Sequence, residues 1–231
     1  MDPQHIIPPG KAAGCLFRAS PFGKCCDVFA DKIPTMTDGE ISALITTHEG
    51  MRKYVNDIFD QDGIGSCAAE ATAQALQIAR AIAGLTWVQL SPWSLYHYSS
   101  GGSDRGSNID TNLEIAILKG IASMAVWPRS NSFRKTLSPE AVADAKKYRA
   151  DEFFDIGTVQ EFKTALMCGM PVVYGSSGHA KCAVKLRPDL KSFDYANSWD
   201  ESWGDNGFGV EQFGSGVNWG YGAFAVRTTV E

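Results

Sequence analysis

The stretch that decides the interpretation of this chain is Gln61-Asp62-Gly63-Ile64-Gly65-Ser66-Cys67-Ala68. Its two glycines predict a loop in which the backbone can come close to a ligand. Ser66 is expected to cap an alanine-rich helix that runs from Cys67 to about Leu85. A thiol in the first turn of a helix lies at the positive end of the helix dipole, which favours the thiolate. The stretch therefore predicts a nucleophilic cysteine at position 67.

The alternative is an inert thiol buried in a core helix, which is the commoner case for a cysteine considered alone. Two further residues change this balance. His179 follows Gly178 at the start of a predicted strand, and Asn197 ends a later strand, just before Ser198-Trp199. A Cys, a His and an Asn in this order are the parts of a cysteine nucleophile with an oriented base.

The composition excludes several other classes of protein. The chain has 231 residues, 44% hydrophobic content and a net charge of −5 at pH 7, as expected for a soluble globular protein that does not bind nucleic acid. It contains no apolar run long enough to span a membrane, and residues 1–9 do not resemble a signal peptide. We therefore expect no nucleic-acid partner, no membrane partner, and a cytoplasmic or otherwise reducing compartment. A virion is the alternative location.

The six cysteines are expected to be mostly reduced. If Cys67 is a free nucleophile, five remain, so at least one more is unpaired. The chain has no C-x-x-C pair, and we therefore expect no metal and no cofactor. A disulfide between the adjacent pair Cys25-Cys26 and Cys15 stays open.

The order of predicted elements indicates an α+β protein whose helices and strands lie in separate halves. Residues 1–36 are punctuated by proline and glycine and are expected to form an irregular arm. Residues 37–231 would form one domain, with a helical half at about 37–150 and a β-rich half at about 151–231. Two capping boxes are predicted, at Thr37-Asp38-Gly39-Glu40 and Thr158-Val159-Gln160-Glu161. A cleft between the halves is the default place for a site.

Three motifs resemble those of the papain-like cysteine peptidases. The stretch from Gln61 to Ala68 resembles the Gln-to-Cys motif of that family, and Gly178-His179-Ala180 resembles its histidine motif. The asparagine motif is the most specific, and here it reads Asn197-Ser198-Trp199-x-x-x-Trp203-Gly204-x-Asn206-Gly207-Phe208. The resemblance runs from about Lys53 to the C-terminus. It is nearest to the bacterial, archaeal and phage-type members.

The resemblance implies a fold and a reaction. The nucleophile helix of the helical half would pack against an antiparallel, β-barrel-like half, with the active-site cleft between them. The chain would be a thiol-dependent endopeptidase acting on protein or peptide substrates. Cys67 would form the acyl-enzyme, His179 would act as acid and base, and Asn197 would orient His179.

The resemblance also implies supporting residues. The side-chain amide of Gln61 and the backbone N–H of Cys67 would form the oxyanion hole. Trp199 would shield the bond between histidine and asparagine, with Trp203 as further support. The substrate backbone would pair with a loop that contains Gly106, Ser107 and Asn108.

Four departures from the family pattern leave other functions open. Ala68 replaces a common Trp, Ile64 replaces a disulfide cysteine of secreted relatives, and Asp200 replaces a Gly. Glu70 lies one turn after Cys67, where a carboxylate would raise the pKa of the thiol. One alternative is a papain-fold structural or binding component of a larger assembly, such as a phage particle, attached through the arm. The other is an amidase that acts on cell-wall peptides with the same three residues.

Two further expectations concern the arm and the charge of the site. The arm contains apolar residues, among them Leu16, Phe17 and Phe22, and is expected to pack on the body, across the cleft. Docking on a partner chain and disorder are the alternatives. The thiol and the imidazole are expected to be an ion pair at neutral pH, with the pKa of Cys67 lowered and that of His179 raised.

Overall fold

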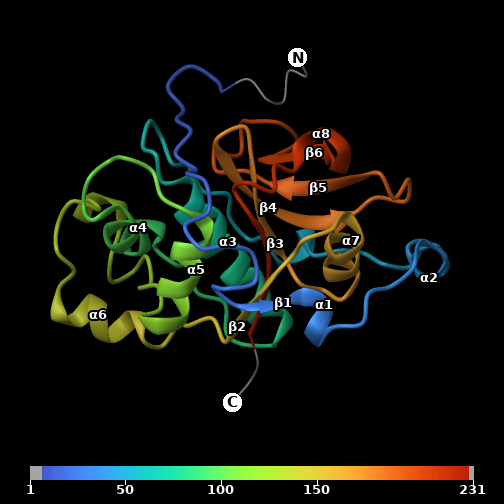
Figure 1. The fold of residues 1–231 in the computed structure, drawn as a ribbon. Helices are drawn as coiled ribbons and strands as arrows, with labels where there is room; N and C mark the ends of the chain where they lie inside the picture. The colour runs from blue at the N-terminus through green and yellow to red at the C-terminus, as the bar shows by residue number, and fades with distance from the viewer. Residues whose placement is uncertain (1–6, 229–231) are drawn as a thin grey trace.

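The computed structural model of this protein describes residues 7–228, and its helices pack on one twisted sheet (Figure 1). Within these residues the sheet has seven strands in the order β1-β2-β7-β3-β4-β5-β6. All neighbours are antiparallel except β1 and β2, which are parallel. The strands are β1 (Asp27–Val28), β2 (Glu152–Asp155), β3 (Val172–Ser176), β4 (His179–Leu186), β5 (Ser192–Ala196), β6 (Phe208–Gln212) and β7 (Ala223–Arg227).

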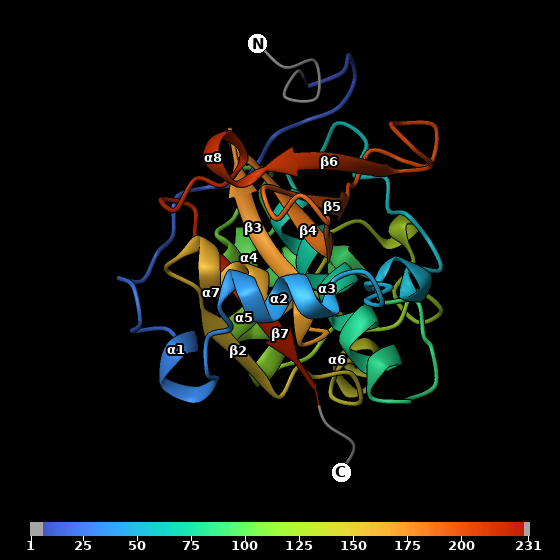
Figure 2. The same ribbon diagram turned by 90° about the vertical axis from the view of Figure 1, so that its right-hand side faces the viewer.

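Helices lie on both sides of the strands (Figure 1). In Figure 1, α4, α5 and α6 lie to the left of α3, and the strands β5 and β6 lie to the right. In Figure 1, α7 and α2 lie to the right of α3, and in the view turned by 90° they lie in front of α4 and α5 (Figure 2). The helices are α1 (Phe29–Lys32), α2 (Asp38–Leu44), α3 (Cys67–Ile82), α4 (Pro92–Ser100), α5 (Ile109–Leu118), α6 (Pro139–Ala145), α7 (Val159–Met167) and α8 (Phe213–Gly216), with 3₁₀ turns at Arg52–Tyr54 and Arg129–Asn131.

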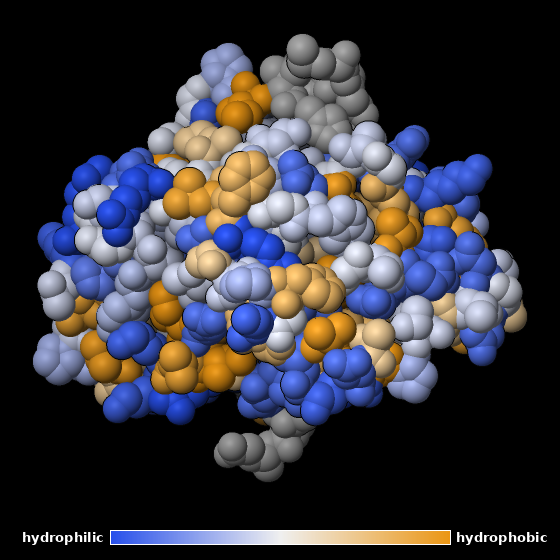
Figure 3. Space-filling model, viewed as in Figure 1, coloured by the Kyte–Doolittle hydropathy of each residue, from blue (hydrophilic) through white to orange (hydrophobic). Residues whose placement is uncertain are grey.

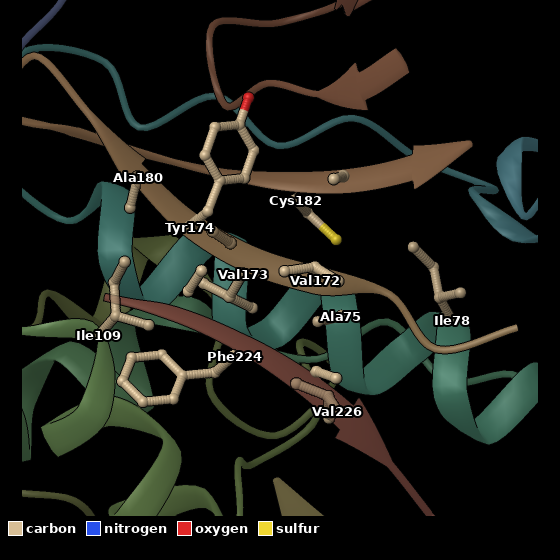
Figure 4. Close-up of a cluster of buried hydrophobic side chains, with 14 of the residues drawn as sticks. Ala75, Ile78, Ile109, Val172, Val173, Tyr174, Ala180, Cys182, Phe224 and Val226 are labelled. Carbon is tan, nitrogen blue, oxygen red and sulfur yellow. The ribbon is translucent and has the colours of Figure 1, made fainter. Parts of the chain in front are cut away.

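The alanines of α3 explain how one helix can lie so close to the sheet. From Cys67 to Ala79 every residue of α3 is buried, including six alanines. In Figure 4, Ala75 and Ile78 of α3 face a layer of apolar side chains from β3, β4 and β7. Small side chains let the helix backbone approach the sheet while the larger side chains of the strands fill the space. The core therefore fixes where α3 begins relative to β4.

The local predictions at helix starts have mixed outcomes. The capping box at Thr37 and Glu40 is confirmed, and the side chain of Thr158 accepts the backbone N–H of Glu161 at the start of α7. Ser66 occupies the N-cap position of α3, but the prediction that its side chain caps the helix is wrong. Its hydroxyl instead donates to Glu70 at 3.0 Å, because this buried carboxylate requires donors.

The prediction of an α+β fold is confirmed, with one refinement. The β-rich half was expected to be antiparallel, but β1 and β2 pair in parallel, because β1 comes from the N-terminal arm.

The six cysteines all lie in the described residues and are free, so no disulfide joins Cys15 to Cys25 or Cys26. Among residues 7–228, the helices are too short or too polar to cross a membrane.

Candidate active site

Cys67 lies at the start of α3 and is completely buried. Its sulfur receives backbone N–H groups from Ala180 of β4, from Gly14 of the arm and from Ala68 in its own helix. Since Ala180 follows His179, the start of β4 lies against the start of α3. The loop-to-helix junction and the histidine motif, 112 residues apart in the sequence, therefore meet at one thiol.

His179 and Asn197 form a buried hydrogen-bonded pair. The Nε2 atom of His179 lies 2.7 Å from Oδ1 of Asn197, which also accepts the backbone N–H of Ser198 at 2.9 Å. His179 begins β4, and Asn197 directly follows the last residue of β5. The antiparallel pairing of β4 with β5 therefore brings the two residues together. The other ring nitrogen of His179, Nδ1, is buried without a hydrogen-bond partner among the described residues. Nδ1 is therefore the ring nitrogen of His179 that can still form a hydrogen bond with another group.

Two tryptophans of the asparagine motif cover this pair. The ring of Trp199 stacks on the His179 ring with centroids 4.5 Å apart and planes 20° apart. Trp203 contacts Trp199 edge to face at 5.4 Å. The stacked indole keeps water away from the hydrogen bond between His179 and Asn197, and a hydrogen bond is stronger in a dry setting.

Gln61 is buried beside the same cluster. Its Oε1 accepts the hydroxyl of Ser198 at 2.5 Å, and its Nε2 donates to Ile64 O at 2.8 Å and to Ala12 O at 3.0 Å. The backbone N–H of Gln61 also donates to Ser198 O at 3.0 Å. Ser198 therefore ties the glutamine motif to the asparagine motif. The sequence reasoning assigned no role to this serine, although it stands inside the motif.

A crossing segment of the arm, residues 12–16, lies directly over these groups. Gly14 O accepts the backbone N–H of Ser107 at 2.9 Å, and the N–H of Leu16 donates to Ser107 O at 3.1 Å. On the other side, the N–H of Cys15 donates to Gly178 O at 2.9 Å. The arm is thus held like an extra strand between the helical half and the β-rich half. Figure 1 shows it as the blue segment that descends between α4 and β4.

The three residues expected to pair with substrate all contact the arm. Ser107 forms the two bonds described above, and the side-chain amide of Asn108 donates to Phe17 O. Gly106 lies so close to the arm that a Cβ there would be 2.3 Å from Gly14 O. The space left beside the arm is a cavity of about 340 Å³, lined by residues 12–16 and by the loops at 63–65 and 104–106. Polar and apolar side chains are interspersed over this face of the molecule (Figure 3).

An anchor segment, residues 17–29, fastens the arm to the body. Arg18 pairs with the fully buried Asp155, and Asp110 accepts the backbone N–H groups of Ala19 and Ser20 at 2.9 and 2.8 Å. Phe29 is fully buried in the core. For the described part of the arm, residues 7–36, the prediction that it packs on the body, across the cleft, is confirmed, although Leu16, Phe17 and Phe22 stay exposed. Residues 1–6 of the predicted arm lie outside the described residues. The alternative of attachment to a larger assembly through the arm is not supported, because residues 14–18 are engaged with their own chain.

The electrostatics of the closed site contradict the expected ion pair. Burial raises the pKa of the Cys67 thiol to about 11, although the N–H groups on its sulfur lower it. Burial and then the charge of Lys181 lower the pKa of His179 to about 3, against the opposite effect of Asn197. Both shifts run opposite to expectation because the arm and the sheet exclude water, and a charge is costly in a dry site. With the arm in place, both groups are neutral at pH 7.

Two departures from the family pattern also have a structural explanation. Glu70 is fully buried and pairs with Arg129 at 2.8 Å, so its charge is balanced, and it raises the pKa of Cys67 only as a minor cause. Asp200 adopts a φ of 62°, in the left-handed region that favours glycine, and its carboxylate accepts the N–H of Ser202 at 2.7 Å. Local hydrogen bonding by aspartate stabilises this conformation.

One group of side chains within residues 7–228 has the composition of a metal site. It consists of Cys25, Cys26 and Asp155, whose ligand atoms lie within 4.8 Å of one another. Asp155 is already paired with Arg18. The positive charge that a metal would bring is therefore already supplied by the guanidinium.

Comparisons with known proteins agree with this architecture. No family model matches the chain. It is 26% identical to an uncharacterized peptidase C1-like protein, L477, of Acanthamoeba polyphaga mimivirus, over 76% of this chain and 69% of that protein. The structure of xylellain, a cysteine protease from Xylella fastidiosa, matches with a TM-score of 0.74 and 18% identity, over 98% of this chain and 100% of xylellain. The fold is papain-like.

A second solved structure supports the same conclusion. The ragweed pollen allergen Amb a 11, a cysteine protease in its proform, has a TM-score of 0.66 and 20% identity, over 85% of this chain and 71% of that chain. The expected papain-like fold is therefore confirmed, and it is shared with cysteine proteases of a bacterium and a plant. Whether the chain is nearest to the bacterial, archaeal and phage-type members stays a prediction.

Proposed function

We propose that this chain is a thiol-dependent endopeptidase that its own arm keeps latent. The observation that carries the proposal is the convergence at the start of α3, where the buried Cys67 meets β4 beside the His179–Asn197 pair under Trp199. Cys67 would attack a peptide carbonyl carbon, and His179 would protonate the leaving amine and later activate the water that releases the acyl group. Asn197 would hold the imidazole in the required orientation.

The oxyanion would be bound by Gln61 and by the backbone N–H of Cys67. One of the two amide hydrogens of Gln61 is engaged by Ile64 O, and the other donates to Ala12 O of the crossing segment. When the segment leaves, that second hydrogen becomes free for substrate. One donor of this kind contributes about 2.7–4 kcal/mol to transition-state stabilisation.

Latency follows from what the crossing segment presents to the thiol. The group at the sulfur is the N–H of Gly14, which is a donor and not a carbonyl carbon that the thiol could attack. The same segment takes the hydrogen bonds of Ser107 and Gly178 that an extended peptide would otherwise use. An occupant held in this way excludes substrate without being a good substrate itself.

The test is a single substitution that expels the crossing segment from a full-length chain. A Cβ on Gly14 would lie 2.1 Å from Gly65 O, so Gly14→Ala cannot keep the closed arrangement. We expect this variant to hydrolyse denatured casein and to react with iodoacetamide at Cys67 at least about tenfold faster than the wild type, since a clash of this kind costs about 1–3 kcal/mol. The gain should vanish in Gly14→Ala/Cys67→Ala.

Gly63→Ala is the matched control. A Cβ there would be 3.5 Å from Gly10 O, an ordinary contact, so the arm should stay in place and activity should stay low. If Gly14→Ala reacts readily with iodoacetamide but cleaves neither casein nor short peptides, endopeptidase activity is excluded. Slow labelling in both variants would favour the alternative of a structural or binding protein with a papain-like fold.

A further inference from the structure

A small cavity lies beside Asn197, between α3, the start of β4 and the end of β5. Its volume is about 10 Å³, and its lining includes Glu70, Gln74, Ala180, Asn197 and Ser198. That volume corresponds to about one water molecule and excludes any larger ligand. The lining is polar on two sides, because α3 contributes a carboxylate and an amide and the end of β5 contributes a second amide.

Three buried polar atoms belong to the side chains that line this cavity. Nδ2 of Asn197 and both Nε2 and Oε1 of Gln74 have no hydrogen-bond partner among residues 7–228. Gln74 is 3% exposed and Asn197 is 4% exposed, so bulk water does not supply the missing partners. Buried polar atoms are almost always paired with protein or with ordered water. A donor of Asn197 and an acceptor of Gln74 beside one water-sized space point to a common partner.

Gln77 shows that α3 can satisfy a buried glutamine directly. It lies one turn after Gln74, and it is 2% exposed. Its Nε2 donates to Asp57 at 3.1 Å, and its Oε1 accepts the backbone N–H of Leu90 at 2.7 Å. Gln74 has the same chemistry and the same burial but faces the cavity instead. Gln74 and Gln77 therefore differ in their surroundings and not in residue type.

We infer that one ordered water occupies this cavity and joins Gln74 to Asn197, which makes Gln74 a positioning residue for the His179–Asn197 pair. The inference rests on the proposed function. The water accepts a hydrogen bond from Nδ2 of Asn197 and donates one to Oε1 of Gln74. Glu70, one turn earlier on the same helix, lines the cavity and supplies a further acceptor. Three partners are typical of a buried water.

This arrangement decides which way the Asn197 amide faces. Oδ1 must point to His179 to accept the ring N–H, and it is held there by the N–H of Ser198 as well. If the amide turned over, its NH₂ group would face the ring N–H, and two donors would oppose each other. The water fixes the opposite end of the same amide. Gln74 lies seven residues, about two helical turns, after Cys67, so one helix carries the nucleophile and also supports the partner of its base.

The first experiment is a double-mutant cycle in the full-length Gly14→Ala protein, measured as peptide hydrolysis. Gln74→Leu keeps the size of the side chain and removes the hydrogen bonds. We expect kcat to fall about fivefold to tenfold with KM unchanged, which is the effect of one hydrogen bond. In an Asn197→Ala background the same change should have no further effect, because Gln74 acts through Asn197.

Two controls separate positioning from stability. Gln77→Leu removes a buried glutamine of the same helix that does not line the cavity, and its effect on kcat should be the same in both backgrounds. Gln74→Asn keeps an amide and should retain kcat within about threefold, which covers the case that Gln74→Leu does not fold. An equal loss for Gln74→Leu in both backgrounds, or no loss in either, overturns the positioning role.

The second experiment does not depend on activity. A high-resolution crystal structure of the full-length wild-type protein should contain an ordered water within hydrogen-bond distance of Asn197 Nδ2 and Gln74 Oε1, and Gln74→Leu should lose it. A dry cavity in the wild type overturns the inference. If the water is present but the Gly14→Ala protein hydrolyses no peptide, the proposed function fails while the water-mediated link between Gln74 and Asn197 stands.

Discussion

The two parts of the N-terminal arm are held in contrasting ways. The crossing segment, residues 12–16, is fixed mainly by backbone hydrogen bonds to Ser107 and Gly178, and its side chains are mostly small. The anchor segment, residues 17–29, is fixed by side chains that enter the body, above all Arg18 and Phe29. Backbone bonds of this kind can be replaced by those of a substrate, whereas the buried side chains cannot leave without cost. The anchor therefore keeps the crossing segment at a high effective concentration over the cleft.

The largest effect is expected when the side chain of Arg18 is removed from the anchor segment. Asp155 is fully buried, and removing its cationic partner leaves an uncompensated charge, which costs about 3–5 kcal/mol. Arg18→Ala should therefore lower the free energy of unfolding by that amount in urea melts. Arg18→Ala/Asp155→Asn should recover part of the loss. If Arg18→Ala speeds labelling of Cys67 and leaves stability unchanged, the distinction between anchor and crossing segment is wrong.

The pH dependence should sharpen the comparison, because only the crossing segment covers the neutral pair. The pKa of His179 is lowered to about 3, so the stability that neutral His179 contributes is present above its ordinary value of 6.5 and is lost as pH falls toward 3. The pKa of Cys67 is raised to about 11, so its contribution is present below its ordinary value of 9.0 and is lost as pH rises toward 11. The titration of each group changes the free energy of the closed state by at most about 1.4 kcal/mol per pH unit.

We therefore expect the closed arm to be most stable between pH 6.5 and 9. The measurement is the rate of Cys67 labelling from pH 4 to pH 10, divided by the rate for a free thiol at the same pH. His179→Gln should remove the acid-side increase and leave the alkaline side unchanged. A profile that is flat on the acid side in the wild type would mean that His179 is not kept neutral by the arm.

A smaller effect is expected at Phe17, at the junction of the two segments. Its ring stacks on Tyr221 with centroids 4.5 Å apart, although Phe17 is 63% exposed. An aromatic pair of this kind contributes about 0.5–1.5 kcal/mol. Phe17→Ala should raise the rate of Cys67 labelling about twofold to tenfold with little change in the unfolding transition. A large fall in overall stability would place Phe17 with the anchor instead.

The smallest effect is expected at Lys11, before the crossing segment. Its ammonium pairs with Asp60 at 2.6 Å and with Asp200 at 3.0 Å, and both carboxylates are about one third exposed. Partly exposed pairs contribute about 0.2–1 kcal/mol each and weaken in salt. Lys11→Met should raise the labelling rate up to about fivefold at low salt and less at high salt. An effect that does not depend on salt would argue against the ion pairs.

The departures at Ala68 and Ile64 show where sequence reasoning is limited. Ala68 is fully buried in α3, where a small side chain fits the close packing of helix and sheet. Ile64 packs partly buried against the core, so it replaces a bonded cysteine with an apolar contact. Both can be named from the sequence as departures, but their meaning depends on neighbours that are distant in the chain.

The sequence by itself determined the elements and the chemistry of the site. Helix caps, alternating strand residues and three local motifs identified α3, β4 and the group Cys67, His179 and Asn197, because each signal is carried by residues close together in the chain. Only the tertiary structure decided what surrounds them. The course of the arm over Cys67, the neutral state of the buried pair and the cavity between Gln74 and Asn197 all depend on contacts between distant segments. Burial and desolvation arise only when those segments pack, so a local pattern cannot encode the pKa shifts that follow from them.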